Sequence, residues 1–201
     1  MQSDTLTLRN IRDENIRMKE EVHHLRNEVR RLQEIIRALN TLQYNIDAIS
    51  EETDVISLIH NILSAALVTV GTDNGSLLLM DSDENQLAFV DVIGPSNDDL
   101  LGYRMPADEG VAGWVINNKS PVLIEDVSQD QRWSSNVDDT IGFHTASLIA
   151  VPLMDDDRPL GIIEVVNSVG SPPFQDGDLD IMLLVARLAS LALSQAEKVA
   201  V

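Results

Sequence analysis

The 201-residue sequence contains no cysteine. This absence excludes disulfides, thiol catalysis, cysteine-ligated metals and cofactors attached through sulfur, and it fits a reducing compartment. The sequence also lacks a run of about eighteen apolar residues, the length that spans a membrane. Its first ten residues, MQSDTLTLRN, lack the basic segment and apolar run of an export signal. We therefore expect a cytoplasmic protein with no membrane partner.

Basic residues are scarce outside the first forty positions. Residues 1–40 hold eight Lys or Arg and seven Asp or Glu, whereas residues 41–201 hold six basic and 26 acidic side chains. Nucleic-acid binding depends on neutralising phosphates, so this composition excludes nucleic acid as a partner. An anionic ligand would need a local site that overcomes the negative field.

Residues 8–46 combine frequent charges with a seven-residue repeat of apolar side chains. Two registers three residues apart form the a and d positions of a heptad, with mostly Val and Ile at a and mostly Leu at d, a combination that favours two parallel strands. The a positions hold Leu8, Asn15, Val22, Val29 and Ile36, and the d positions hold Ile11, Met18, Leu25, Leu32 and Leu39. This pattern predicts a parallel coiled-coil homodimer formed by residues 1–47.

Asn15 and the flanking charges support the same pairing. A buried Asn at an a position disfavours slipped registers and higher oligomers, because its amide is satisfied only opposite its counterpart. Glu14 with Lys19, and Glu21 with Arg26, have the spacing that pairs opposite charges between parallel chains. The alternative is a single amphipathic surface helix. Such a helix would be roughly 60 Å long at 1.5 Å per residue, more than a small domain covers.

Residues 48–201 have the pattern of one mixed domain. A helix is predicted from Thr53 or Asp54 to near Gly71, and an acid-capped, strongly apolar helix begins near Asp176 or Asp178. Between them, GSLLLMD with QLAFVDVIG, and SLIAVPLM with RPLGIIEVVN, predict two hairpins. A short helix at EGVAGWV and a polar covering loop, SQDQRWSSNVDDTIGFHTA, fall between these hairpins.

Several stretches of this region resemble the GAF domain family. They are DEGVAGWV followed by PVLIEDV, then DQRW, then SLIAVPLMDDDRPLGIIEVVN and FQDGDLDIMLLVARLASLAL, in the family's order and spacing from about Ala48 to Ala196. The resemblance implies an α+β fold with a central antiparallel sheet. It also implies helices that form a dimer bundle on one side of the sheet, and a ligand cavity roofed by loops and short helices on the other.

The last helix is apolar almost all round, which indicates burial on more than one side. One side can cover the sheet, and the other requires a partner. We expect Leu184, Leu188 and Leu191 to contribute to the dimer interface. The alternative is a helix that is wholly internal to one chain.

The sequence excludes two of the activities known in the family and makes a third less favoured. Bilin-binding members and free methionine sulfoxide reductases depend on cysteine, which this chain lacks. Members that bind cyclic nucleotides carry a motif of Asn-Lys, Phe and Asp-Glu, and the matching positions here are Asn167, Ser168, Phe174, Asp178 and Leu179. The Lys and the Glu are missing, so cyclic-nucleotide binding is kept as a minor alternative.

No catalytic or metal-binding set is recognisable in the sequence. His144 lies near Thr145 and Ser147, but a nucleophile needs a base and an orienting acid in a defined geometry. The acidic run 155–157 falls where a hairpin must turn, and turns recruit Asp for local hydrogen bonds. We expect a protein that is not an enzyme and that has no cofactor and no metal.

The candidate ligand site lies in the segments that the resemblance places around the cavity. Both Trp residues of the chain occur there, and the candidate ligand-binding residues are Trp114, Arg132, Trp133, Phe143, His144 and Thr145. Lys119 and Arg132 are the only basic residues in the covering segment, residues 114–145. The ligand is therefore expected to be a small molecule that is neutral or singly charged.

These features together predict a dimeric, non-catalytic signalling module. A small molecule would change the packing of the roof and helices, and the coiled coil would carry a rotation or register change to a signalling partner. The alternative is a structural dimerisation or adaptor domain with an empty or vestigial pocket.

Overall fold

A computed structural model describes residues 14–15, 17–19, 21–22, 25–26, 29, 54–95, 97–168 and 170–199. The chain divides into two units, Met1–Asn45 and Ile46–Val201. The domain boundary predicted at residues 47 and 48 stays a prediction.

The described residues of the first unit are helical. Its heptad residues Met18, Val22, Leu25 and Val29 are 43% to 56% exposed in the single chain. Five further predicted seam residues lie outside the described residues: Leu8, Ile11, Leu32, Ile36 and Leu39. Pairing of two such helices in a coiled coil stays a prediction.

The second unit is built on a six-stranded sheet in which every neighbouring pair is antiparallel. The strand order is β3-β2-β1-β6-β5-β4. The strands are β1 (Gly75–Asp81), β2 (Gln86–Ile93), β3 (Arg104–Pro106), β4 (Val122–Ile124), β5 (Thr145–Asp155) and β6 (Arg158–Ser168). The two predicted hairpins, β1–β2 and β5–β6, are confirmed and form adjacent halves of the sheet.

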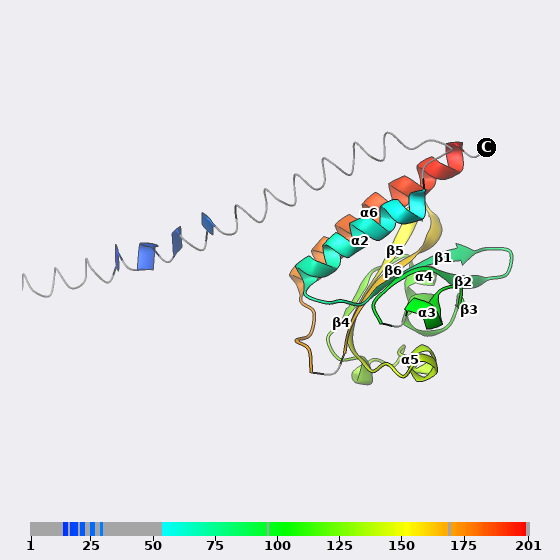
Figure 1. The fold of residues 1–201 in the computed structure, drawn as a ribbon, viewed down its shortest axis with the longest axis horizontal. Coiled ribbons are helices and arrows are strands. Elements are labelled where there is room, and N and C mark those ends of the chain that lie inside the picture. Colours follow the sequence, from blue (N-terminus) through cyan, green and yellow to red (C-terminus); the bar gives the residue numbers. More distant parts are fainter. Residues whose placement is uncertain are drawn as a thin grey trace, which may run out of the picture. The chain divides into compact units, whose positions relative to one another are not determined.

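Two long helices lie side by side on one face of the sheet, and the shorter helices are grouped apart from them (Figure 1). The long helices are α2 (Val55–Val70) and α6 (Asp176–Val199), and the short ones are α3 (Asn97–Leu100), α4 (Gly110–Asn118), η1 (Val127–Gln129) and α5 (Asn136–Ile141). Asp54 begins α2 as predicted, because its carboxylate accepts hydrogen bonds from the Ser57 backbone N–H at 3.1 Å and hydroxyl at 2.6 Å. The arrangement confirms the expected α+β fold.

Both faces of the sheet are buried. Neighbouring residues on a strand point to opposite sides of the sheet, and β6 shows burial on both. Ile163 and Val165 of β6 are fully buried on the face that α2 and α6 cover. Ile162 belongs to a second cluster on the opposite face, which includes Leu87 of β2 and Val115 of α4. Strand β6 therefore contributes to both cores.

Helix α6 is long and apolar enough, by length and composition, to cross a membrane. The core helix of a folded domain has the same composition. Met182, Ala189 and Ala192 of α6 are fully buried in the domain. Packing on the sheet therefore accounts for the apolar residues on that side of the helix.

Gly161 of β6 lies where β1 passes very closely. A Cβ added at this position would lie 2.1 Å from the carbonyl oxygen of Leu78, a backbone atom that cannot turn away. We expect Gly161→Ala to lower the free energy of unfolding by about 3 kcal/mol, measured by urea denaturation. Gly177→Ala in α6, where no atom lies within 4 Å of the added Cβ, is the matched control. It should stay within about 1 kcal/mol of the wild type. Equal stability of the two variants would contradict the register between β1 and β6.

Candidate ligand-binding site

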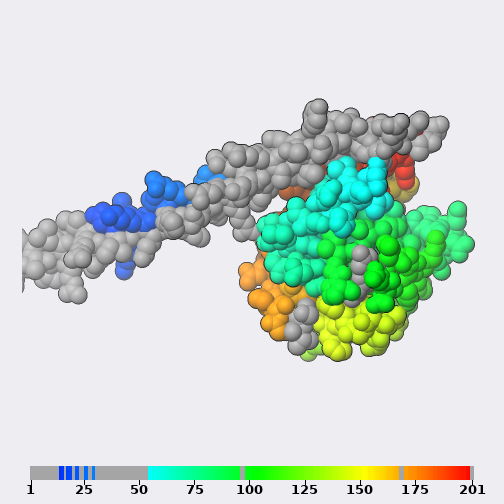
Figure 2. All heavy atoms as spheres, viewed as in Figure 1, coloured from blue at the N-terminus to red at the C-terminus, as the bar shows by residue number. Residues whose placement is uncertain are grey.

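A cavity of about 140 Å³ lies against the sheet face opposite α2 and α6. Its floor comes from β1, β5 and β6, with Ser76, Leu148, Glu164 and Val166 among its residues. Its cover comes from the first turn of α4 and from residues 133–143, which include α5. We call α4 and residues 130–143 the roof. In Figure 2 the yellow-green atoms of the α5 region lie at the lower edge of the view, opposite the cyan atoms of α2.

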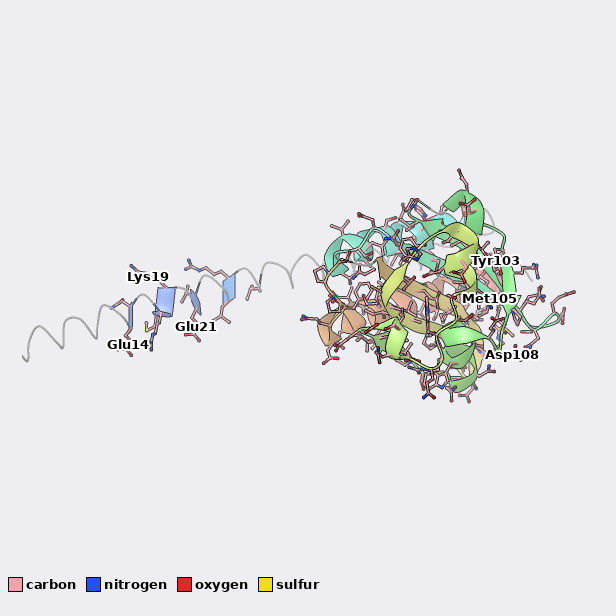
Figure 3. The ribbon with its side chains drawn as sticks, turned by 90° about the horizontal axis from the view of Figure 1, so that it is seen from below. Glu14, Lys19, Glu21, Tyr103, Met105 and Asp108 are labelled. Atoms are coloured by element: carbon pink, nitrogen blue, oxygen red, sulfur yellow. The ribbon has the colours of Figure 1, made fainter. Side chains whose placement is uncertain are left out.

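The cavity walls are mainly apolar. Phe89 of β2 and Tyr103 line it and pack edge to face, with ring centroids 6.2 Å apart and planes at 60°. Met105 of β3 is close to Tyr103 along the chain and lines the same wall (Figure 3). Trp133 and Phe143 close the wall on the roof side. This part of the site suits an apolar ligand body.

Two carboxylates of the cavity hold the roof in place. Glu109, at the start of α4, accepts hydrogen bonds from the Ser134 hydroxyl at 3.3 Å and from the Asn136 side-chain amide. Asp138 of α5 accepts from the backbone N–H of Thr145 at 2.7 Å and from its hydroxyl at 2.9 Å. The first set of bonds joins α4 to α5, and the second joins α5 to the start of β5.

Glu164 is the third carboxylate of the cavity, and it lies on the floor. Its Cα pairs with those of Ser76 on β1 and Ala150 on β5, so the residue sits in the middle of the sheet. Its side chain makes no hydrogen bond or ion pair within the part of the chain that the structure describes. Burial without a compensating donor disfavours the charged form and raises the pKa of Glu164 to about 7.

Three of the six candidate residues from the sequence line the cavity: Trp133, Phe143 and Thr145. Trp114 and Arg132 lie outside the lining and contact each other, with the guanidinium carbon 4.5 Å from the Trp ring centroid. Arg132 also forms an ion pair with Asp130 at 2.6 Å. This pairing occupies the arginine away from the cavity.

His144 is exposed and also lies outside the lining. Its neighbours Phe143 and Thr145 both line the cavity. His144 differs from them only in the direction of its side chain. A role of these six residues in ligand binding stays a prediction.

Sequence reasoning missed Glu164, Tyr103, Glu109 and Asp138. A signal for Glu164 is present in GIIEVVN, where an acid occupies one of the alternate positions Ile162, Glu164 and Val166 of an otherwise apolar strand. An acid at such a position is unusual in a buried strand and indicates a cavity or a partner. The other three residues carry no such signal, because they lie in segments without a clear period.

The raised pKa of Glu164 has a consequence for stability. Since ionisation is unfavourable in the folded state, the carboxylate destabilises the fold above pH 7, and this effect disappears below its unfolded pKa of 4.5. We expect Glu164→Gln to raise the free energy of unfolding by up to about 3 kcal/mol at pH 8.5. At pH 4 the substitution should have little effect.

Urea denaturation of both proteins across this pH range measures the difference. The matched control is Glu125→Gln, which removes an exposed carboxylate. A difference between Glu164→Gln and the wild type that does not change with pH would contradict the burial of an unpartnered carboxyl group.

The fold matches those of known proteins. A family model for the GAF domain matches residues 54–193. Among solved structures, the GAF domain of an Acinetobacter phosphoenolpyruvate-protein phosphotransferase superposes with a TM-score of 0.66 at 18% identity, covering 82% of this chain and 96% of that one. Free methionine-R-sulfoxide reductase from Neisseria meningitidis, solved with its substrate, gives a TM-score of 0.65 at 21% identity, covering 81% and 89%.

Sequence relatives include parts of much longer enzymes. The dual 3',5'-cyclic-AMP and -GMP phosphodiesterase 11A of Takifugu rubripes is 26% identical over 161 residues, which are 74% of this chain and 18% of the relative. The corresponding phosphodiesterase 11 of Drosophila melanogaster is 26% identical over 163 residues, 74% of this chain and 11% of the relative. The chain thus spans less than a fifth of these relatives. The family model covers most of the second unit, and this chain belongs to the GAF domain family.

Proposed function

We propose that this chain is a non-catalytic, dimeric sensing module that binds a small molecule in the cavity and passes the change to a cytoplasmic signalling partner. GAF domains are regulatory or sensing modules, and the sequence relatives of this chain include parts of larger enzymes. The observation that carries the proposal is the cavity itself. It is mainly apolar, is covered by a roof held with hydrogen bonds, and contains one carboxyl group, that of Glu164, with no partner among the described residues.

The β5–β6 hairpin supports a route from the cavity to α6. Glu164 of β6 faces the cavity, whereas its neighbours Ile163 and Val165 are buried on the helix-covered face. Any shift of β6 that accommodates a ligand therefore acts on the helix side through the same strand.

The far end of this hairpin is bonded to α6. The Met154 backbone N–H donates to the Ser190 hydroxyl at 2.9 Å, and the Ser194 hydroxyl donates to the Asp155 carboxylate at 2.9 Å. Arg158 donates to Glu197. These bonds favour movement of the hairpin end and α6 as one body.

Dimerisation is supported by exposed apolar side chains. Leu183 and Leu191 of α6 are 40% and 51% exposed, and Val68 of α2 is 84% exposed. Leu184 and Leu188, also predicted at the interface, are partly buried in the single chain. Together with the exposed heptad residues of the first unit, these side chains provide apolar surface for a second copy.

Cyclic-nucleotide binding is a second candidate, because the phosphodiesterase relatives act on cyclic nucleotides. Two features weigh against it. The described lining residues include three acids and no Lys, Arg or His, so a phosphate would lack a cation. In addition, Asn167 donates to the Pro172 carbonyl at 3.0 Å and Phe174 is fully buried, and neither lines the cavity. These motif positions support the connection between β6 and α6.

A thermal-shift screen of small molecules tests the sensing proposal. A ligand at a hundredfold excess over its Kd stabilises the protein by about 2.7 kcal/mol, which is ample to detect. Trp133→Ala, which removes a cavity wall, should weaken the shift of any hit. His144→Ala, an exposed neighbour of the cavity, is the matched control and should keep it. Full shifts in both variants would place the ligand elsewhere, and a screen without hits, cyclic nucleotides included, would favour the adaptor alternative.

Sedimentation equilibrium at micromolar concentration tests the assembly. We expect a dimer, and we expect Val22→Asp to raise its dissociation constant at least about tenfold, because a charge would enter the apolar seam. Arg17→Asp places the same side chain at an outward heptad position and is the control. A monomer, a trimer or equal effects of both substitutions would contradict the coiled-coil dimer.

A further inference from the structure

Aromatic side chains are concentrated at the cavity. The whole chain has seven, two Trp, two Tyr and three Phe. Four of them line this cavity: Phe89, Tyr103, Trp133 and Phe143. Aromatic faces carry negative charge density and attract cations, and clustered aromatic rings recognise ammonium groups in many proteins. The concentration of such rings in one small cavity indicates more than apolar filling.

The charged groups of the cavity have one sign. Glu109 and Asp138 are occupied by hydrogen bonds from the roof and from β5, and Glu164 alone has no partner among the described residues. No described lining residue is Lys, Arg or His. A ligand that donates hydrogen bonds or carries positive charge would satisfy the half-buried carboxyl group of Glu164, whereas an anion would meet only like charge.

We propose that the cavity selects a small organic cation, an ammonium group on an apolar body, whose N–H groups donate to the Glu164 carboxylate while its body lies against the aromatic walls. This inference rests on the proposed sensing function and names the chemical class of its ligand. The excess of acidic over basic residues in positions 41–201 also raises the local concentration of cations around the domain.

The size of the cavity limits the body of the ligand. An engineered apolar cavity of about 150 Å³ in another protein holds one benzene molecule. The present cavity, at about 140 Å³, therefore suits a single six-membered ring or a chain of similar volume. Piperidine and benzylamine are cations of this size class at neutral pH. Tetrahydropyran and benzyl alcohol are their uncharged counterparts of similar shape.

The affinity for a cation depends on the ionisation of Glu164. The other titratable groups that line the cavity are Glu109 just before α4, Asp138 of α5 and Tyr103 just before β3, and none of them carries a positive charge. Since the pKa of Glu164 is about 7, its carboxyl group is neutral at pH 5 and must lose its proton to pair with an ammonium group. Affinity therefore rises about tenfold per pH unit from pH 5 to 7 and is constant above it.

Isothermal titration calorimetry of the full chain with these four probes tests the inference. At pH 8 we expect piperidine and benzylamine to bind at least about tenfold more tightly than their uncharged counterparts. Glu164→Gln should abolish this preference by weakening the cations, with the affinities of tetrahydropyran and benzyl alcohol unchanged. Glu125→Gln, an exposed carboxylate outside the lining, should retain the preference. In the wild type, the affinity for the two cations should rise from pH 5 to 7 and then stay constant. The affinity for the two uncharged probes should not change with pH.

The inference is overturned if neither cation binds, if both bind no better than their counterparts, or if Glu164→Gln keeps the preference. Its failure is distinguishable from failure of the sensing proposal. A neutral or anionic compound that stabilises the protein in a Trp133-dependent manner would support the sensing proposal and contradict only the cationic class of ligand. If no compound binds the cavity, both proposals fail.

Discussion

A single antiparallel sheet that is apolar on both faces must be covered on both, and this requirement shapes the whole domain. The two long helices α2 and α6 cover one face, where Ile163 and Val165 of β6 are fully buried. The other face is covered by the short helix α4 and by residues 130–143, which leave a cavity of about 140 Å³. Strand β6 belongs to both layers, so the packing of α6 and the shape of the cavity share one element.

Glu164 is the residue at which stability and function oppose each other. A carboxyl group at the centre of a buried sheet, without a donor among the described residues, lowers the stability of the fold when it ionises. Leucine at this position would remove the penalty and fill the space. A ligand that satisfies the carboxylate turns this unfavourable group into a binding determinant, and functional sites commonly carry such local costs.

Local chemistry made much of the fold predictable. The cap at Asp54, the two hairpins and the apolar last helix each follow from short stretches of sequence. The site was less predictable, because a loop has no period that tells which side chains point inward. Trp114 and Arg132 stack on each other outside the cavity, while Trp133, the next residue along, lines it. The alternation of residues along β6 could have indicated Glu164 as a site residue. That it has no partner among the described residues depends on β1, β5 and the roof, which only the tertiary structure brings together.

The carboxyl carbon of Glu164 offers the most direct measurement. Carbon-13 NMR of glutamate-labelled protein, with Glu164→Gln to assign the signal, follows its ionisation with pH. We expect a midpoint near pH 7 in the free protein and a clear decrease when benzylamine is added, because the ammonium group stabilises the carboxylate. A midpoint near 4.5 that benzylamine does not change would contradict both the burial of this group and its role in ligand recognition.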